Sequence, residues 1–289
     1  MTAIAPSPRH PRGRALRSAV FPAFVAFAIV AVLTAAPGRA LAQRYRLQFR
    51  PSVGDTLRME LEEHREHTGT TKFGGSDSSR TMSTRLRMVS RAIVQAKLHS
   101  AVTVLAIVDS VSLVTNDQHA RATSAGQRML FRLSEDGTMR VVDEETGANR
   151  GTSELVALMP AALPTHAVAV GDTWTRSIPM VVARAANDGV VLASFRLDSV
   201  SRDEQLAYIS MRGEIKRDSI PAGPPRGSRM AVSGTVTGTL LLDRRRGWLT
   251  ESRFAVTLRT TMLPAASSSA YPMRFLTRIS QRMRTLDRK

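Results

Sequence analysis

The chain contains no cysteine, and only 5% of its 289 residues are aromatic. Disulfides, thiol nucleophiles and cysteine-ligated metals are therefore excluded, and the fold must be held by its core alone. Lysine is also scarce, because Lys72, Lys97, Lys216 and Lys289 are the only ones. The basic charge is thus almost entirely arginine. Few aromatic rings are present for bases to stack on, which disfavours nucleic acid as a partner.

The local motifs of several enzyme classes are missing too. The sequence has no G-x-S-x-G, S-x-x-K or H-E-x-x-H, and no glycine loop of the phosphate-binding kind. A Ser-His-Asp set would have to be assembled in space from five histidines outside the N-terminal segment, namely His64, His67, His99, His119 and His166. We therefore expect no enzymatic activity, no cofactor and no metal, with a hydrolase as a minor alternative.

The first 42 residues have the pattern of a secretory signal peptide. Residues 1–17 contain four arginines and no acid, an apolar run covers residues 19–36, and A-L-A precedes Gln43. We expect cleavage after Ala42 and a location in the periplasm or cell envelope. No cysteine follows the apolar run for lipid attachment. The length of that run leaves an uncleaved N-terminal membrane anchor as the alternative.

The mature chain would comprise residues 43–289, long enough to bury about 70–75% of its unfolded surface. We expect a single β-rich domain, or alternatively two halves of about 43–150 and 151–289. Removing the five arginines of residues 1–42 leaves 36 basic and 24 acidic side chains, a net charge of +12. A GC-rich genome would produce this arginine bias without any selection for binding; the functional alternative is attraction to anionic components of the envelope.

Alternation of apolar and polar residues dominates the mature sequence and predicts β-strands. In residues 232–242, valines, leucines and two glycines share one face, while serine and threonines share the other. After R-R-R-G, a second alternating run begins at Trp248, and a third follows L-P-A-A-S-S-S. These runs predict an antiparallel meander of long strands. Gly234 and Gly238 mark places where a curved sheet bends or a backbone approaches closely.

The N-terminal part alternates in the same way, with strands expected in residues 45–49, 82–98 and 101–114. One short helix is predicted near residues 153–160, from a threonine or serine cap to Pro160. The fold class expected from these patterns is all-β with minor α content. Its long antiparallel β-meander is expected to form a curved sheet or half-barrel.

The tetrapeptide V-G-D-T occurs twice and predicts a turn that starts a strand. Glycine at positions 54 and 171 can adopt positive φ, and Asp55 and Asp172 can close an Asx turn. We therefore interpret Gly54, Asp55, Gly171, Asp172 and Trp174 as a structural motif, with Trp174 packed inward.

Each copy is followed by D-S-V-S. The first begins at Asp109 and the second at Asp198, so they lie 55 residues after Gly54 and 27 residues after Gly171. The unequal spacing argues against a simple duplication.

Two longer segments carry a family resemblance. L-M-P-A-A-L-P-T-H-A-V-A-V-G-D-T-W-T and, later, G-T-V-T-G-T-L-L-L-D-R-R-R-G-W-L-T-E-S are similar to a family of exported bacterial proteins and lipoproteins, a domain of unknown function. The resemblance covers most of residues 44–262. It implies an exported all-β fold and no particular chemistry. This chain departs from the lipoprotein members in lacking the anchoring cysteine.

The stretch M-E-L-E-E-H-R-E-H is the sharpest chemical candidate. As a strand it would place Glu60, Glu62, His64 and Glu66 on one face, where carboxylates and an imidazole could hold a divalent metal. As a helix it would instead group Glu60, His64 and His67. A single strand holds too few ligands firmly, so we interpret the stretch as a solvated face near a strand end.

The last two strands suggest a binding function. If they pair as a hairpin, alternation places Trp248, Phe254, Val256, Phe275 and Ile279 on one apolar face. We therefore predict non-enzymatic binding of a hydrophobic or lipid-like ligand in a curved β-sheet. The alternatives are a structural or interaction protein of the cell envelope without a small ligand and, less favoured because aromatic residues are few, an outer-membrane β-barrel.

Overall fold

A computed structural model of the chain describes residues 43–73, 76–120, 125–144, 162–180, 189–221, 228–265 and 271–286. All of them belong to one compact unit, Gln43–Lys289. The signal segment expected at residues 1–42 and the helix expected near residues 153–160 lie outside the described residues. Within the described residues every regular element is a strand. No helix there is long and apolar enough to span a membrane.

The strands vary from short bridges to very long elements. In chain order they are β1 (Arg44–Tyr45), β2 (Thr56–Phe73), β3 (Ser76–Leu98), β4 (Ala101–Thr115), β5 (Gln118–Ala120), β6 (Arg128–Ser134), β7 (Met139–Glu144), β8 (Val168–Ala169), β9 (Thr173–Met180), β10 (Gly189–Val200), β11 (Leu206–Pro221), β12 (Arg229–Asp243), β13 (Trp248–Leu263) and β14 (Met273–Leu286). β2 and β3, with 18 and 23 residues, are far longer than an average strand of about five or six residues.

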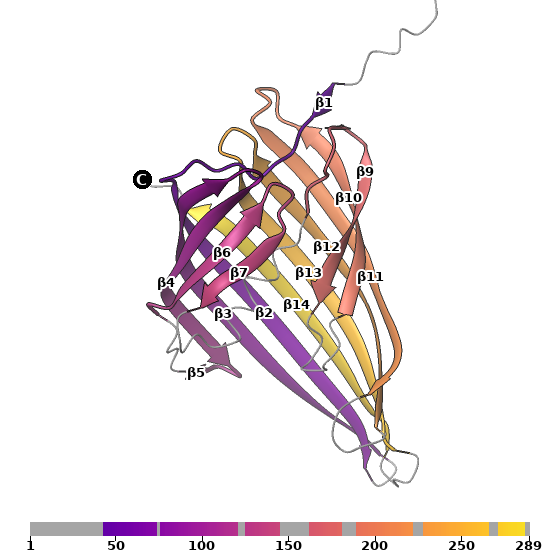
Figure 1. Cartoon of the computed structure of the whole chain (residues 1–289). Coiled ribbons are helices and arrows are strands. Elements are labelled where there is room, and N and C mark those ends of the chain that lie inside the picture. Colours follow the sequence, from indigo (N-terminus) through magenta and orange to yellow (C-terminus); the bar gives the residue numbers. More distant parts are fainter. Residues whose placement is uncertain are drawn as a thin grey trace, which may run out of the picture. The chain divides into compact units, whose positions relative to one another are not determined.

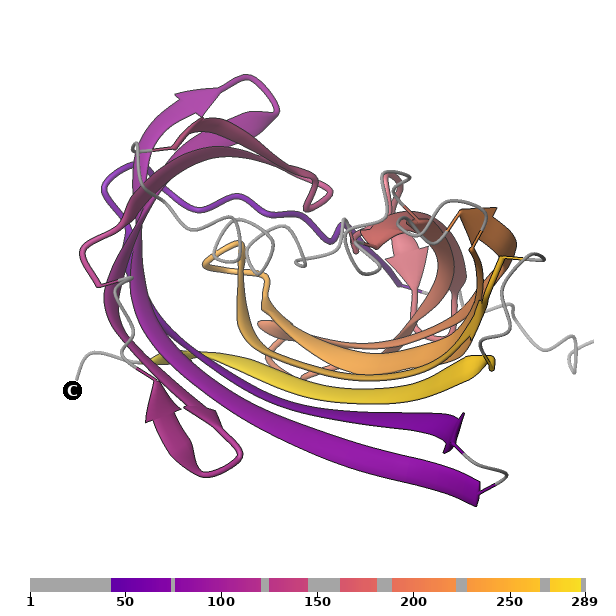
Figure 2. The ribbon, with the colours of Figure 1, turned by 90° about the horizontal axis from the view of Figure 1, so that it is seen from below.

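One antiparallel sheet of 12 strands organises the fold, in the order β7-β6-β4-β3-β2-β14-β13-β12-β11-β10-β9, with β5 attached to β4. The sheet is open, because β7 and β9 form its two edges. It bends into the curve seen in Figure 2. The expected all-β class and curved antiparallel sheet are confirmed. The N-terminal and C-terminal groups of strands meet in the middle of the sheet, where the first long strand, β2, pairs with the last strand, β14.

The two faces of this sheet differ sharply in burial. We call the face inside the curve the concave face and the opposite one the outer face. Alternation along β12 puts Val232, Val236, Leu240 and Leu242 on the concave face, where all four are buried. From β4 and β6, in the other half of the strand order, Val104, Phe131 and Leu133 contribute to the same core. The core therefore lies against the concave face, as the period-two pattern requires.

The N-terminal segment runs across the open side of the curve at one end of the sheet (Figures 1 and 2). It inserts Leu47 and Phe49, both fully buried, into the core. β1 pairs with β8, and further along the Phe49 N–H donates to the Glu135 carbonyl at 2.9 Å. We call residues 43–51 the strap. The strap thus covers the core at this end of the sheet.

The β12–β13 turn holds the strap from the other side. The Arg50 N–H donates to the Gly247 carbonyl at 3.0 Å, and the Phe49 ring meets the Trp248 ring edge-on with centroids 6.1 Å apart. Gly247 has a φ of +61°, and a Cβ there would lie 2.6 Å from the backbone of Arg50. Only glycine therefore allows the strap to lie this close to the turn.

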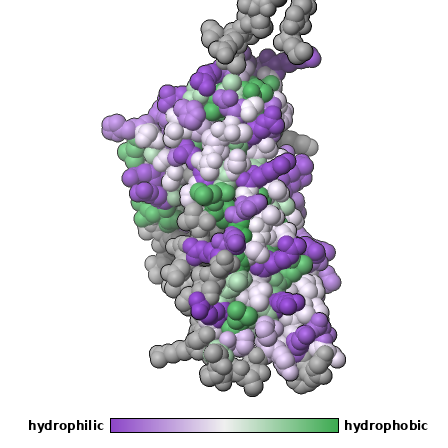
Figure 3. Space-filling view, turned by 90° about the vertical axis from the view of Figure 1, so that its right-hand side faces the viewer, coloured by the Kyte–Doolittle hydropathy of each residue, from purple (hydrophilic) through white to green (hydrophobic). Residues whose placement is uncertain are grey.

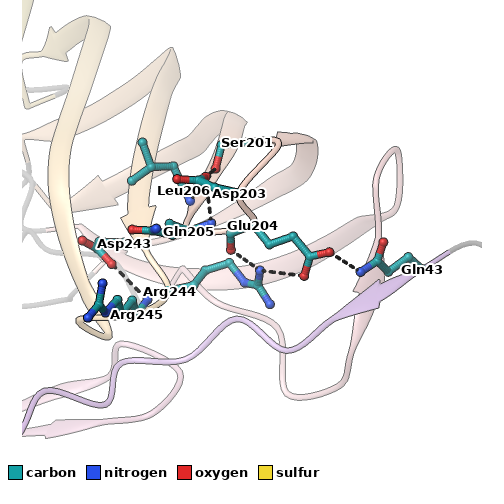
Figure 4. Close-up of polar contacts among 9 residues, drawn as sticks. All are labelled: Gln43, Ser201, Asp203, Glu204, Gln205, Leu206, Asp243, Arg244 and Arg245. Atoms are coloured by element: carbon teal, nitrogen blue, oxygen red, sulfur yellow. Dashed lines mark hydrogen bonds and ion pairs between the residues drawn. The ribbon is translucent and has the colours of Figure 1, made fainter.

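Polar contacts tie the start of the strap to two turns (Figure 4). Gln43 Nε2 donates to Glu204 Oε1 at 2.6 Å, in the β10–β11 turn. The guanidinium of Arg244, in the β12–β13 turn, donates to the Glu204 carbonyl and lies 4.8 Å from the centre of the Tyr45 ring. Asp243 Oδ1 accepts from the Arg245 N–H at 2.9 Å. Both turns are thus fixed to the strap and to each other.

The two V-G-D-T copies form the same turn. Asp55 N–H donates to the Ser52 carbonyl and Asp172 N–H to the Ala169 carbonyl, each at 3.0 Å. In each turn glycine occupies the third position with positive φ, +91° at Gly54 and +94° at Gly171, as a type II turn needs. The aspartate side chains close the turns, since Oδ2 accepts from the N–H of Ser52 at 2.8 Å and of Ala169 at 2.9 Å.

Trp174 follows the second turn and points into the core. Its ring stacks on Phe195, its partner across β9 and β10, with centroids 5.9 Å apart. The indole Nε1 donates to the Ala162 carbonyl at 2.7 Å. Packing and a satisfied hydrogen bond together account for this side chain.

Candidate ligand-binding face

Four of the five residues of the predicted apolar face lie together on the concave face. β13 and β14 pair with Val256 opposite Ile279, Phe254 opposite Gln281, and Thr260 opposite Phe275. Phe254, Val256, Phe275 and Ile279 thus point to the same side of the sheet and are all half-buried. Phe254 and Val256 also pack against the core.

Trp248 does not lie with these four. The register shifts between Leu241, opposite Glu251, and Leu242, opposite Leu249, so one extra residue is inserted in β13. Because a one-residue bulge moves each following side chain to the other face, Leu249 takes the inward position that alternation assigned to Trp248. Trp248 is instead buried beside Phe49 under the strap, where its Nε1 has no hydrogen-bond partner.

The two glycines of β12 let side chains of β13 lie across it. A Cβ at Gly238 would be 2.4 Å from Cδ1 of Phe254, and one at Gly234 would be 2.1 Å from the carbonyl oxygen of Thr257. A methyl group therefore fits at neither glycine. The glycines expected to mark a close approach therefore position Phe254 and Leu258 over the neighbouring strand.

Burial on the concave face decreases with distance from the strap. The row Ser252, Met283, Leu61 and Met88, which crosses β13, β14, β2 and β3, is buried. Two rows further along, Val256 and Ile279 are half-buried, and Met82 and Met273 on the same face are 43% and 40% exposed. We call this less covered part of the concave face, beyond the buried row, the apolar trough floor.

A charged pair lies where the buried core gives way to the trough floor. Glu63 occupies the next row after Leu61, between Gln281 on β14 and Leu86 on β3. The Arg65 guanidinium donates to Glu63 Oε1 at 2.9 Å. The Glu63 side chain is only 7% exposed, and its second oxygen, Oε2, is buried with no hydrogen-bond partner. Leaving a buried acceptor unpaired costs about 1–3 kcal/mol.

His67 adds a second polar group on the same strand. Its ring stacks on Phe275, with centroids 5.2 Å apart, and its Nδ1 lies 2.8 Å from Thr277 Oγ1. Gly69 leaves room for the Phe275 ring, because a Cβ there would be 3.2 Å from it. The trough floor therefore combines apolar side chains, mainly of β13 and β14, with polar side chains, mainly of β2. Small-molecule sites in proteins likewise place a few polar groups beside apolar ones.

Sequence reasoning missed Glu63 and Arg65 and considered His67 only for a helical grouping or a spatially assembled triad, although a signal was present. In β2 the inward positions begin with apolar Leu57, Met59 and Leu61 and then continue with these three polar residues. An inward face that turns polar in mid-strand marks either a strand leaving the core or a site.

Glu60 and Glu66 lie on the outer face, as the strand interpretation required, but both are paired with arginines. Glu60 Oε1 accepts from Arg87 and Oε2 from Arg284, each Nε–O distance being 2.6 Å. Glu66 lies 3.6 Å from Arg278. With only 2% of its side chain exposed, Glu60 is not part of a solvated face, because the arginines of β3 and β14 cover it.

The electrostatics of Glu60 follow from this clamp. Desolvation raises the pKa of the carboxyl, but the hydrogen bonds and charges of Arg284 and Arg87 outweigh it and lower the pKa.

His64 and His67 point to opposite faces, which excludes the helical grouping. No cluster of three or more possible metal-binding side chains occurs among the residues that the structure describes.

The outer face also carries a shallow groove of about 500 Å³ across β4, β3, β2, β14 and β13. Arg85, Arg87, Arg253 and Arg282 line it, with Glu62 and His64 between them. Arg253 and Arg282 both donate to Glu251 Oε1 at 2.8 Å. Another side of the molecule is mostly hydrophilic with small hydrophobic groups (Figure 3).

Comparisons with known proteins assign no activity to the chain. Over residues 152–249 the chain is similar to a family described as a family of unknown function (DUF6263). No curated protein matches it. A solved structure described as "Lipid-protein interactions in lipovitellin" is similar with a TM-score of 0.45 and 8% identity. That likeness covers 83% of this chain but 25% of the lipovitellin chain, so this chain spans a quarter of its length.

Proposed function

We propose that the protein is exported and binds a hydrophobic or lipid-like molecule, without catalysis, on the apolar trough floor. The observation that carries this proposal is the incomplete cover over Val256, Ile279, Met82 and Met273 on the inward face of an open sheet. An inward apolar face is normally covered by a packed layer, since its exposure to water is unfavourable. A ligand would supply that layer.

The chemistry of the floor suits an alkyl chain. Burying a methylene group stabilises a complex by about 0.8 kcal/mol, so a chain of several carbons would gain substantially from this contact. The unbranched side chains of Met82, Met262 and Met273 adapt to flexible ligands.

A thermal-shift titration with decanol below its aggregation limit tests the proposal. A ligand that binds only the folded state stabilises it by about 2.7 kcal/mol at a hundredfold excess over Kd, so Tm should rise with concentration. Phe254→Arg should abolish the rise by placing a charge on the trough floor. Tyr208→Arg, on the outer face, is the matched control and should keep it. A wild-type Tm that no alkyl ligand shifts would sink the proposal in favour of an envelope scaffold.

Export has its own test. The proposal rests on the basic segment, the apolar run and A-L-A before Gln43. N-terminal sequencing of protein recovered from the envelope fraction should begin at Gln43. A chain that retains Met1 would contradict cleavage and favour the anchored alternative.

A further inference from the structure

The orphaned oxygen of Glu63 restricts the chemistry of any molecule that occupies the trough floor. This inference rests on the proposed function and refines it. Glu63 Oε2 is a buried acceptor without a partner, whereas Oε1 is satisfied by Arg65. Buried polar atoms in native proteins are nearly always paired, so each exception needs an explanation.

The position of Glu63 gives that explanation. Its row, Phe254, Gln281, Glu63 and Leu86, lies directly between the buried row of Leu61 and the half-buried row of Val256. An alkyl chain lying on Val256 and Ile279 would end at this row. The polar end of such a molecule would therefore meet the glutamate and Gln281 at the inner end of the trough floor.

The charges decide what that polar end can be. Glu63 and Arg65 form a neutral pair in which the arginine already occupies one carboxylate oxygen. An anionic head group would bring like charge to the remaining oxygen, and a cationic one would bring like charge to the Arg65 guanidinium, whose side chain is 46% exposed on the same face. A hydroxyl or amide N–H group can donate to Oε2 without either cost.

We propose that Glu63 is the head-group acceptor of the trough, and that the ligand is an uncharged amphiphile whose hydroxyl or amide donates a hydrogen bond to Oε2. A hydrogen bond to a charged acceptor is among the stronger ones in proteins. It would fix the direction of the alkyl chain on the floor, with the tail toward Phe275 and Met273.

The test uses two probes with the same number of heavy atoms, decanol and methyl nonyl ether, which differ in the hydroxyl donor. Titration calorimetry should give a Kd for decanol that is roughly tenfold or more below that of the ether. Decanoate should bind more weakly than decanol. In Glu63→Gln the ratio of the alcohol and ether Kd values should fall toward one, while Glu62→Gln, one residue away on the outer face, should keep the wild-type ratio.

The outcomes separate the inference from the proposed function. If the alcohol and the ether bind wild-type protein equally, or decanoate binds best, the role of Glu63 is overturned and hydrophobic binding stands. If none of the three probes binds, the proposed function itself fails. The comparison on wild-type protein decides the matter even if Glu63→Gln does not fold.

Discussion

The two V-G-D-T hairpins share a turn but differ in everything that follows it. The first leads into β2 and β3, with 18 and 23 residues, and the second into β9 and β10, with 8 and 12. β2 lies in the middle of the sheet, whereas β9 is an edge. The tetrapeptide therefore determines how a strand starts. The residues after it decide how long the strand runs and what it pairs with.

The likeness between the hairpins extends to the opposite strand. The Gly54 N–H donates to the Val94 carbonyl and the Gly171 N–H to the Leu197 carbonyl, at 2.9 and 2.7 Å. The register shifts directly after each acceptor, between Val94 and Ala96 and between Leu197 and Ser199. The two D-S-V-S segments are not equivalent, because one lies in β4 and the other in β10. The recurring unit is a turn and the bulge facing it.

The largest difference between the hairpins should appear two residues after each aspartate. Trp174→Ala removes a buried ring and its hydrogen bond to Ala162, and should lower the free energy of unfolding by about 3–5 kcal/mol. Leu57→Ala, at the equivalent position of the first hairpin, removes a half-buried side chain and should cost clearly less. Urea denaturation of both variants measures this. Equal losses would show that the first hairpin is anchored as deeply as the second.

The turns themselves should respond alike. Gly54→Ala and Gly171→Ala each place a side chain at a φ near +90°, which should cost about 1–3 kcal/mol. Open space surrounds both positions, because no atom lies within 4 Å of a Cβ built there, so backbone strain is the only expected cost. The two losses, measured by the same denaturation, should agree. A marked inequality would mean that the turns differ in a way their hydrogen bonds do not reveal.

The smallest expected effect is the loss of the Asp172 charge, which should change Tm in a way that depends on pH. The hydrogen bond from the Ala169 N–H, aided by Arg44, lowers the pKa of Asp172 below its ordinary 3.8. Because the pKa of Asp172 is lower in the folded state, its charge stabilises the fold at any pH above the pKa of the unfolded state. This contribution is lost as the pH falls through the pKa of the folded state. Asp172→Asn should therefore lower Tm slightly at neutral pH, with a difference that shrinks below about pH 4. A difference independent of pH would assign the effect to turn geometry instead of charge.

Local features of this fold are readable from the sequence, and long-range ones are not. Alternation predicts β12 and its inward valines, and V-G-D-T predicts the turns, because both depend on neighbouring residues alone. The bulge in β13 removes Trp248 from the apolar face. Counting every second residue back from Phe254 still assigns Trp248 to that face, so alternation alone does not reveal the bulge. The cover over Glu60 needs Arg284 of β14, 224 residues away in sequence, as well as Arg87 of the neighbouring β3. Such pairings are properties of the sheet order.

The pairing of β2 with β14 has a consequence for how the chain folds. Glu60 and Arg284 are bonded across 224 residues of sequence, so the centre of the sheet can close only when almost the whole chain has been made. Contacts so distant in sequence slow folding, because loop entropy is lost before they form. Until then β2 and β13 are unprotected edges, open to pairing with other chains. Premature termination before β14 would therefore expose the middle of the sheet and turn it into a site of aggregation.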